Sequence, residues 1–309
     1  MTLSLLSLVL ALGLAWWRPF AAQEKLWQGL KRVHLWLERS LNAGGKRHGL
    51  LAWVLVVGSA VVLAWLGHVL AGWLGRLFVL AWNVAVLYVL LGYFSLLQQH
   101  RQLASLMQMG DIKQSADQLA GQMKRNGAGW DENTVARLAI ERLFLGAGQS
   151  LFGVALWFML GSSFGPAGAV LYIFSWRAAL DWHGEPENFR FALPAETIFR
   201  WLDGLSARMA AVSFAIVGDF EDALFCWRTQ ARSWGQLAQG IVLASAAGAL
   251  GIKLGEPVPA GDTVEYRPEI GIHDPVGVED MRSADALVWR ALTLWLAVLM
   301  LLTLARWTT

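Results

Sequence analysis

Arg137 and Glu141 form the first pair of residues whose types and spacing could do chemistry. Residues four apart on a helix lie on the same face, so a helix here presents a guanidinium group and a carboxylate together. Arg142 follows directly, and Gln149 lies roughly two turns further along a nearby face. The cluster could form one wall of a polar pocket. It could equally be an ordinary surface ion pair at the start of an apolar helix.

A second pair with the same spacing is Arg177 and Asp181, followed by His183. This pair lies near the end of an apolar segment. Ionisable groups in such a place are costly unless they are paired or in contact with water. Mutual pairing of Arg177 with Asp181 is the simplest way to meet that cost.

The densest acidic group contains Asp203, Asp219, Glu221 and Asp222, with Arg208 among them. Carboxylates from two helix ends could converge on Mg²⁺, which prefers oxygen ligands and keeps several of its waters. Asp203, Asp219 and Asp222 are therefore candidate metal ligands. The same residues could also be the caps of a solvated helix turn.

The fourth group lies in residues 253–285, which are rich in Gly, Pro and Asp and are predicted to form an irregular loop. A loop with charges of both signs could close over an anionic ligand, or it could be a flexible linker. No P-loop, G-x-S-x-G or H-E-x-x-H motif occurs in the sequence. The candidate residues of this loop are Lys253, Glu256, Asp262, Glu265, Arg267, His273, Asp274, Glu279 and Asp280.

Apolar segments must position these clusters. Residues 50–97 contain a single charge, Arg76, and are long enough to cross a bilayer twice with a turn near 72–76, because about 20 apolar residues span the hydrocarbon core. The chain is 56% hydrophobic and only 16% charged, against about 25% in typical soluble domains. We predict an all-α, polytopic membrane protein, a single integral membrane domain with five or six membrane helices. The expected crossings are an uncleaved N-terminal helix ending near Trp17 and residues 50–72, 77–97, 143–160, 166–182 and 286–305.

The distribution of Lys and Arg predicts the orientation in the membrane. Positive charges gather between the first and second crossings, between the third and fourth, and in 183–235, whereas the turns at 72–76 and 161–167 contain only Arg76. The positive-inside rule then places the main polar loops in the cytoplasm and both termini outside, as in a multi-pass protein of a bacterial inner membrane. The net charge of +2 gives no argument for a nucleic-acid partner, so the lipid bilayer is the expected partner.

Shorter helices are expected between the crossings. Residues 24–41 repeat apolar residues every three or four positions, which predicts an amphipathic helix on the inner membrane surface. Residues 98–142 are predicted to form a cytoplasmic helical loop, in which Asp131 or Asn133 can cap a helix that runs straight into the crossing at 143. The segments 209–218 and 236–252 have the length and small-residue content of re-entrant or buried helices.

The C-terminal part of the sequence reads AAGALGIKLG at 246–255 and RPEIG at 267–271, followed by the last apolar helix. These residues resemble elements of the CobD/CbiB membrane family of cobalamin biosynthesis. RLAIERLFLGAGQSLF at 137–152, WRAALD at 176–181 and WLDGLSAR at 201–208 are similar to further family elements in the same order. The similarity covers roughly the last 190 residues, and the hydropathy plan of the rest matches.

The resemblance implies an ATP-dependent amide ligation in which an aminopropanol-type amine is joined to a corrinoid acid, adenosylcobyric acid. Such a reaction needs a nucleotide that activates the acid, Mg²⁺ to neutralise phosphate charge, and groups that position the amine. By resemblance, Glu141 and Asp181 would lie near the cation or the amine. Arg177 and Arg208 would bind anionic groups, and Lys253 and Arg267 would hold the substrate from the loop.

The sequence also departs from the family pattern. Arg142 stands where the family has Asn, Ser206 stands where it has Pro, and the N-terminal Gly-Asp-Pro and His-Pro-Val elements are absent. The AmpE proteins, a related branch linked to the sensing of cell-wall damage and β-lactamase induction, show similar losses and a similar short first helix. A non-enzymatic, AmpE-like signalling role is therefore the alternative to the ligase.

Overall fold

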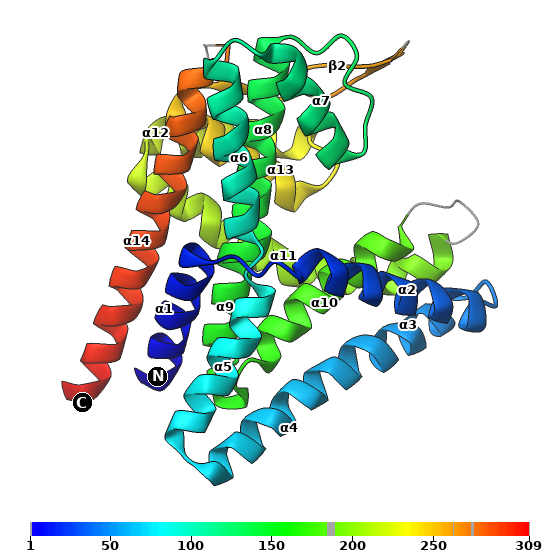
Figure 1. The fold of residues 1–309 in the computed structure, drawn as a ribbon, viewed down its shortest axis with the longest axis vertical. Helices are drawn as coiled ribbons and strands as arrows, with labels where there is room; N and C mark the ends of the chain where they lie inside the picture. Colours follow the sequence, from blue (N-terminus) through cyan, green and yellow to red (C-terminus); the bar gives the residue numbers. More distant parts are fainter. Residues whose placement is uncertain (1, 184–188, 262, 273–274, 309) are drawn as a thin grey trace. The chain divides into compact units, whose positions relative to one another are not determined.

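The computed structural model describes residues 2–183, 189–261, 263–272 and 275–308. Contacts between Cα atoms group the chain into two compact units, and each unit is assembled from separated stretches of sequence. Unit 1 contains Met1–Phe94, Gln149–Ser206 and Leu299–Thr309; unit 2 contains Ser95–Gly148 and Ala207–Val298. Helices dominate both units (Figure 1), which confirms the predicted all-α membrane fold.

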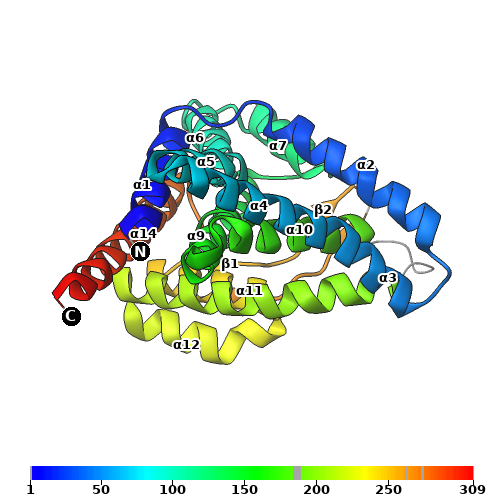
Figure 2. The ribbon, with the colours of Figure 1, turned by 90° about the horizontal axis from the view of Figure 1, so that it is seen from below.

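Unit 1 is a set of apolar helices. Helix α10 packs against α2, α4 and α5, and α1 packs against α5 (Figure 2). The α4–α5 hairpin turns at Gly75, whose φ of 125° is open to glycine and costly for other residues, so the predicted turn at 72–76 is confirmed. The helices of this unit are α1 (Thr2–Trp17), α2 (Gln23–Leu41), α3 (Lys46–Trp53), α4 (Ser59–Leu74), α5 (Arg76–Leu90), α9 (Val154–Leu160) and α10 (Ala167–Trp182).

Unit 2 is built around α8, most of whose side chains are buried. Its first turn is capped as predicted, because the Asp131 carboxylate accepts a hydrogen bond of 2.9 Å from the backbone N–H of Thr134. Asn133 does not cap the helix; its side-chain amide donates to the carbonyl of Val276 at 2.8 Å. The helices of this unit are α7 (Ile112–Met123), α8 (Glu132–Ala147), α12 (Phe220–Gln230) and α13 (Leu237–Leu250). Three further helices have residues in both units: α6 (Tyr93–Gln108), α11 (Phe189–Val217) and α14 (Val278–Thr308).

Helix α13 is buried along nearly its whole length, as expected for the small-residue segment 236–252. It lies against α12 at a distance that only glycine allows, since a Cβ atom on Gly248 would stand 2.4 Å from the carbonyl oxygen of Asp222. The other short apolar segment, 209–218, is the C-terminal part of the long helix α11 rather than a separate re-entrant helix.

The segment that follows α13 is not wholly irregular, as the sequence predicted, but contains two nested antiparallel ladders. Strand β1 (Lys253–Leu254) pairs with β4 (Ile270–Gly271), and between them β2 (Val258–Ala260) pairs with β3 (Thr263–Glu265). The segment also ends earlier than the predicted boundary at 285, because α14 begins at Val278, where the Asp280 carboxylate accepts from the backbone N–H of Gly277. Asp262, His273 and Asp274 lie outside the described residues.

Three helical stretches among the described residues are long and apolar enough to cross a membrane: Lys46–Leu74, Glu132–Leu160 and Val278–Ala305. The pair Arg76–Leu90 and Tyr93–Gln108, bent by 41°, could form a fourth. These correspond to four of the predicted crossings. The other two predicted crossings are α1 and α10, each of 16 residues, and their passage through the bilayer stays a prediction.

Candidate functional site

Glu141 is the centre of a charge network in unit 2, between α8 and the strands that follow α13. Its side chain is buried, with 4% of its surface exposed. One carboxylate oxygen, Oε1, accepts a 2.9 Å hydrogen bond from the backbone N–H of Gly255, and the other forms an ion pair with Arg267. A buried carboxylate requires such partners, because charge removed from water without compensation is strongly destabilising. Glu141 therefore fixes the loop onto α8.

Arg137, one helical turn before Glu141, faces the same loop. The two residues share a helix face, as their spacing predicted, yet each pairs with the loop rather than with the other. The Arg137 guanidinium group forms an ion pair with Glu256 and donates to the side chain of Asn133 at 3.3 Å. Its Nε atom is buried and has no hydrogen-bond partner among the described residues.

Lys253 is the most accessible cation of the network, with 31% of its side chain exposed. Its ammonium group lies 3.1 Å from a carboxylate oxygen of Glu256 and 2.9 Å from one of Glu269. The hydrogen bond to Glu269, together with the one to Glu256, raises the pKa of Lys253 above its ordinary value. Lys253 is thus held as a cation between two carboxylates that both reach solvent.

The loop backbone is strained where it joins the network. Gly255 has a φ of +83°, and a Cβ atom there would lie 1.9 Å from the carbonyl oxygen of Pro268. The next residue, Glu256, also has a positive φ, 63°, although it is not glycine. Left-handed backbone at a non-glycine residue costs on the order of 1 kcal/mol and persists only where the surroundings impose it. Here the ion pairs of Glu256 with Arg137 and Lys253 hold it in place.

Five of the residues that the sequence singled out therefore lie in one network: Arg137, Glu141, Lys253, Glu256 and Arg267. The sequence did not identify two members of this network as site residues. They are Glu269 and Trp234, and the Trp234 ring lies 4.9 Å from the Arg267 guanidinium carbon. The antiparallel pairing of β1 with β4 brings Glu269 back toward Lys253. That register cannot be read from strands of two residues.

The other predicted residues of unit 2 lie elsewhere on its helices. Arg208 is exposed on α11. Arg142 extends to two glutamine side chains, those of Gln122 and Gln99. Asp219 is the N-cap of α12 and its carboxylate accepts from the backbone N–H of Asp222, which agrees with the capping alternative for Asp219.

Asp203, the third proposed metal ligand, belongs to unit 1, where its Oδ1 atom accepts a 2.7 Å hydrogen bond from the hydroxyl of Tyr172. Burial raises the pKa of the Asp203 carboxyl to about 6, although the hydrogen bond from Tyr172 opposes the shift. Within the described part of the chain, no group of three His, Cys, Asp or Glu residues is arranged to hold a metal ion.

Arg177 and Asp181 are also in unit 1, and they do not pair with each other as the sequence suggested. Asp181 instead accepts from Nδ1 of the fully buried His34 at 2.7 Å, a contact between α10 and α2. The Arg177 guanidinium carbon lies 4.6 Å from the ring centroids of both Trp27 and Trp176. His183 contacts Glu196 at 2.7 Å on the exposed surface.

Comparison with known proteins gives matches over most of the chain. The profile of the CobD/CbiB protein family matches residues 4–288, nearly the whole chain. The cobalamin biosynthesis protein CobD of Stutzerimonas stutzeri is 33% identical over 271 residues, which are 85% of this chain and 86% of that protein. The protein of the same name from Chromobacterium violaceum is 31% identical over 216 residues, 70% of this chain and 68% of that one. No solved structure gives a significant match. The chain belongs to the CobD/CbiB family.

Proposed function

We propose that this protein acts in cobalamin biosynthesis as a membrane-bound amide ligase. It joins an aminopropanol-type amine to the carboxyl group of adenosylcobyric acid and consumes ATP. Family membership and the names of the curated relatives support the pathway. The observation that carries the reaction type is the network at the α8–loop junction, where Lys253 lies between Glu256 and Glu269 at the accessible edge of a buried set of ion pairs.

In this proposal the buried and the accessible residues have different roles. Glu141 and Arg137 on α8 and Arg267 in the loop hold the loop in position, because the charged group of each is already paired with a residue of the other element. Lys253 neutralises phosphate charge, because its ammonium group can exchange a carboxylate partner for a phosphate oxygen. Of Glu256 and Glu269, once released from Lys253, one accepts the proton that the amine loses as its nitrogen attacks the activated carboxyl carbon and the activating phosphate group leaves that carbon, and the other remains for Mg²⁺.

Magnesium enters this proposal with ATP, as part of the substrate. Mg²⁺ in phosphate-transfer sites is commonly bound by one or two carboxylates together with substrate phosphates, and does not need a cage of protein ligands. Glu256 and Glu269 are the carboxylates of the network that reach solvent, with 28% and 58% of their side chains exposed. They fit that role better than Asp219, whose carboxylate is engaged in a helix cap.

The test is a ligation assay on the full-length protein in a membrane mimetic, with cobyric acid, the phosphorylated amine and Mg·ATP, followed by mass spectrometry of the corrinoid product. Lys253→Gln should lower kcat/KM by at least about tenfold, the equivalent of one lost charge contact of about 1.4 kcal/mol. Lys113→Gln, which removes an exposed lysine from α7 of the same unit, is the matched control and should leave the rate unchanged. Glu141→Ala and Arg208→Ala test the remaining assignments in the same assay.

The AmpE-like alternative makes the opposite prediction for the wild-type protein. If calorimetric titration detects no binding of Mg·ATP or of cobyric acid, and no product forms, the ligase proposal is wrong. The ion pairs of Glu141 and Arg267 would then serve only to close the loop, as expected in a signalling protein without catalytic activity.

A further inference from the structure

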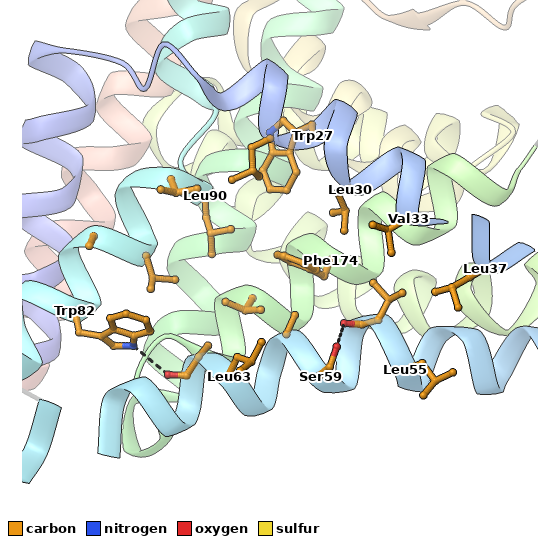
Figure 3. A pocket seen from close by; sticks show the side chains of 18 residues that line it. Trp27, Leu30, Val33, Leu37, Leu55, Ser59, Leu63, Trp82, Leu90 and Phe174 are labelled. Carbon is orange, nitrogen blue, oxygen red and sulfur yellow. Dashed lines mark hydrogen bonds between the residues drawn. The ribbon is translucent and has the colours of Figure 1, made fainter. Parts of the chain in front are cut away.

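Unit 1 contains an open apolar groove that the ligase proposal does not use. Its volume is about 680 Å³, within the range of roughly 300–1,000 Å³ typical of small-molecule sites. Helix α2 contributes Trp27, Leu30 and Val33 to one wall, α4 and α5 form the opposite side, and Phe174 of α10 lies between them (Figure 3).

The groove offers an occupant mainly apolar contact. Its lining contains three side chains with polar groups, those of Trp27, Ser59 and Trp82, and the last two are already satisfied by backbone carbonyls. The Ser59 hydroxyl donates to Val56 at 3.0 Å, and the Trp82 indole N–H donates to Ala64 at 3.0 Å (Figure 3). The part of a ligand that best fits this space is therefore mainly hydrocarbon.

A cation lies directly behind one wall of the groove. Arg177 is one helical turn beyond Phe174 on α10, and its guanidinium group lies 4.6 Å from the ring of Trp27, a groove residue, and 4.6 Å from that of Trp176. Two aromatic faces fix the plane of a guanidinium group but leave its N–H edge available for a phosphate.

The charge of Arg177 is not neutralised by an ion pair. Among the described residues no carboxylate forms an ion pair with it, although the charges of Asp181 and Glu24 act on it from a greater distance, and its Nε atom is buried without a hydrogen-bond partner. The carboxylate one turn away, that of Asp181, is committed to His34 at 2.7 Å. Lys31 and Arg32 are exposed on α2, which adds positive charge to the helix that covers the groove.

We propose that unit 1 binds an anionic phospholipid, with one acyl chain in the groove and the phosphate at Arg177. The depth of the two parts agrees with this occupant. Helix α2 is amphipathic and is expected at the membrane surface, where tryptophan and arginine side chains meet lipid headgroups. The groove beneath α2 is then at the depth of the acyl chains.

The experiment measures lipid retention by native mass spectrometry of the full-length protein in detergent. Dioleoyl phosphatidylglycerol is compared with phosphatidylcholine of the same acyl chains, and glycerol 3-phosphate and inorganic phosphate are added as competitors without tails. Wild-type protein should retain phosphatidylglycerol in preference to phosphatidylcholine. Arg177→Gln should lower the affinity for phosphatidylglycerol about tenfold and abolish the preference. Arg200→Gln, at an exposed arginine of the same unit, is the control and should change neither.

A second variant tests the groove separately from the charge. Ala60→Phe places a ring in the groove and should reduce the retention of both lipids, whereas Leu70→Phe, on the exposed face of α4 outside the groove, should not. Unchanged phosphatidylglycerol binding by Arg177→Gln, or normal lipid retention by Ala60→Phe, would overturn the proposal. Competition by glycerol 3-phosphate or inorganic phosphate at concentrations as low as those of the lipid would also overturn it, because the ligand of Arg177 would then be a small phosphate compound.

Discussion

At the scale of single residues, the Glu141–Arg267 pair is the most sensitive part of unit 2. Only 5% of the Glu141 side chain and 11% of the Arg267 side chain are exposed. Removing one partner of such a pair leaves an uncompensated charge away from water, so Glu141→Gln should lower the free energy of unfolding by roughly 3 kcal/mol. The double variant Glu141→Gln with Arg267→Gln should lose less than the sum of the single variants. Chemical denaturation of the purified protein in detergent measures all three.

The control for this cycle is the exposed ion pair between Arg125 and Glu265, in which about two fifths of each side chain is in contact with solvent. Because solvent screens exposed pairs, Glu265→Gln should change the free energy of unfolding by less than about 1 kcal/mol. Equal effects of the two glutamine substitutions would mean that burial of the Glu141 network contributes nothing.

Asp203 gives a prediction about pH. Its pKa is raised by burial from the ordinary value of 3.8 to about 6, so the folded protein holds this proton more tightly than the unfolded chain does. The free energy of unfolding should therefore fall as the pH rises from about 4 to 6, by at most about 3 kcal/mol, and the contribution of Asp203 should be constant above that range. Asp203→Asn should be more stable than wild type at pH 8 and should lack this dependence. Tryptophan fluorescence during thermal unfolding, at several pH values, is the measurement.

A companion variant separates the charge of Asp203 from its hydrogen bond. Tyr172→Phe removes the donor to Oδ1 and keeps the carboxylate, so it should lower stability at pH 8. If Asp203→Asn is instead less stable than wild type at pH 8, the carboxylate is stabilised by contacts that outweigh its burial.

At the scale of elements, the turn between β1 and β2 depends on Gly255. Alanine at this position would combine an unfavourable φ with a collision against the carbonyl oxygen of Pro268, and the loop would have to move away from Glu141. Gly255→Ala should therefore increase hydrogen exchange throughout β1 and β4 and reduce ligase activity. Gly251→Ala is the matched control. Its φ of +69° is also left-handed, but nothing lies within 4 Å of the added Cβ, so it should cost only about 1 kcal/mol.

The elements also show which parts of the structure local sequence patterns can predict. Helix spans, the turn at Gly75 and the cap at Asp131 were predictable, since hydropathy, glycine and capping residues act within a few positions. The spacing of Arg137 and Glu141 correctly placed them on one face of α8. Their partners come from a loop more than a hundred residues later, and no local pattern reveals that contact.

Asp181 illustrates the same limit in unit 1. The nearest cation in the sequence is Arg177, yet the carboxylate pairs with His34, 147 residues away, because α2 packs against α10. The strands β1 to β4 are only two or three residues long, too short for an alternating pattern, so a sequence rich in Gly and Pro was interpreted as an irregular loop.

At the scale of the whole molecule, the number of crossings depends on the short apolar helices. Helix α1 has 16 residues and is about 24 Å long, less than the hydrocarbon core of roughly 30 Å. It can still span if the bilayer thins locally, and exposed Trp16 and Trp17 at its end suit the headgroup region. If α1 and α10 also pass through the membrane, we expect six crossings, and the distribution of Lys and Arg then predicts the N-terminus outside and α2 in the cytoplasm.

Cysteine labelling in intact cells tests this topology, and the wild-type protein serves as the negative control. Cys226 is fully buried and burial raises the pKa of its thiol to about 11, so it should react only slowly with a membrane-impermeant maleimide. Single cysteines at exposed positions, Thr2→Cys and Ser163→Cys, should be labelled from outside. Lys25→Cys and Asp117→Cys should be labelled only after the membrane is permeabilised. Labelling of Thr2→Cys and Lys25→Cys from the same side would mean that α1 does not cross. The positive charges of α2 would then still mark the cytoplasmic side, and the N-terminus would join them there.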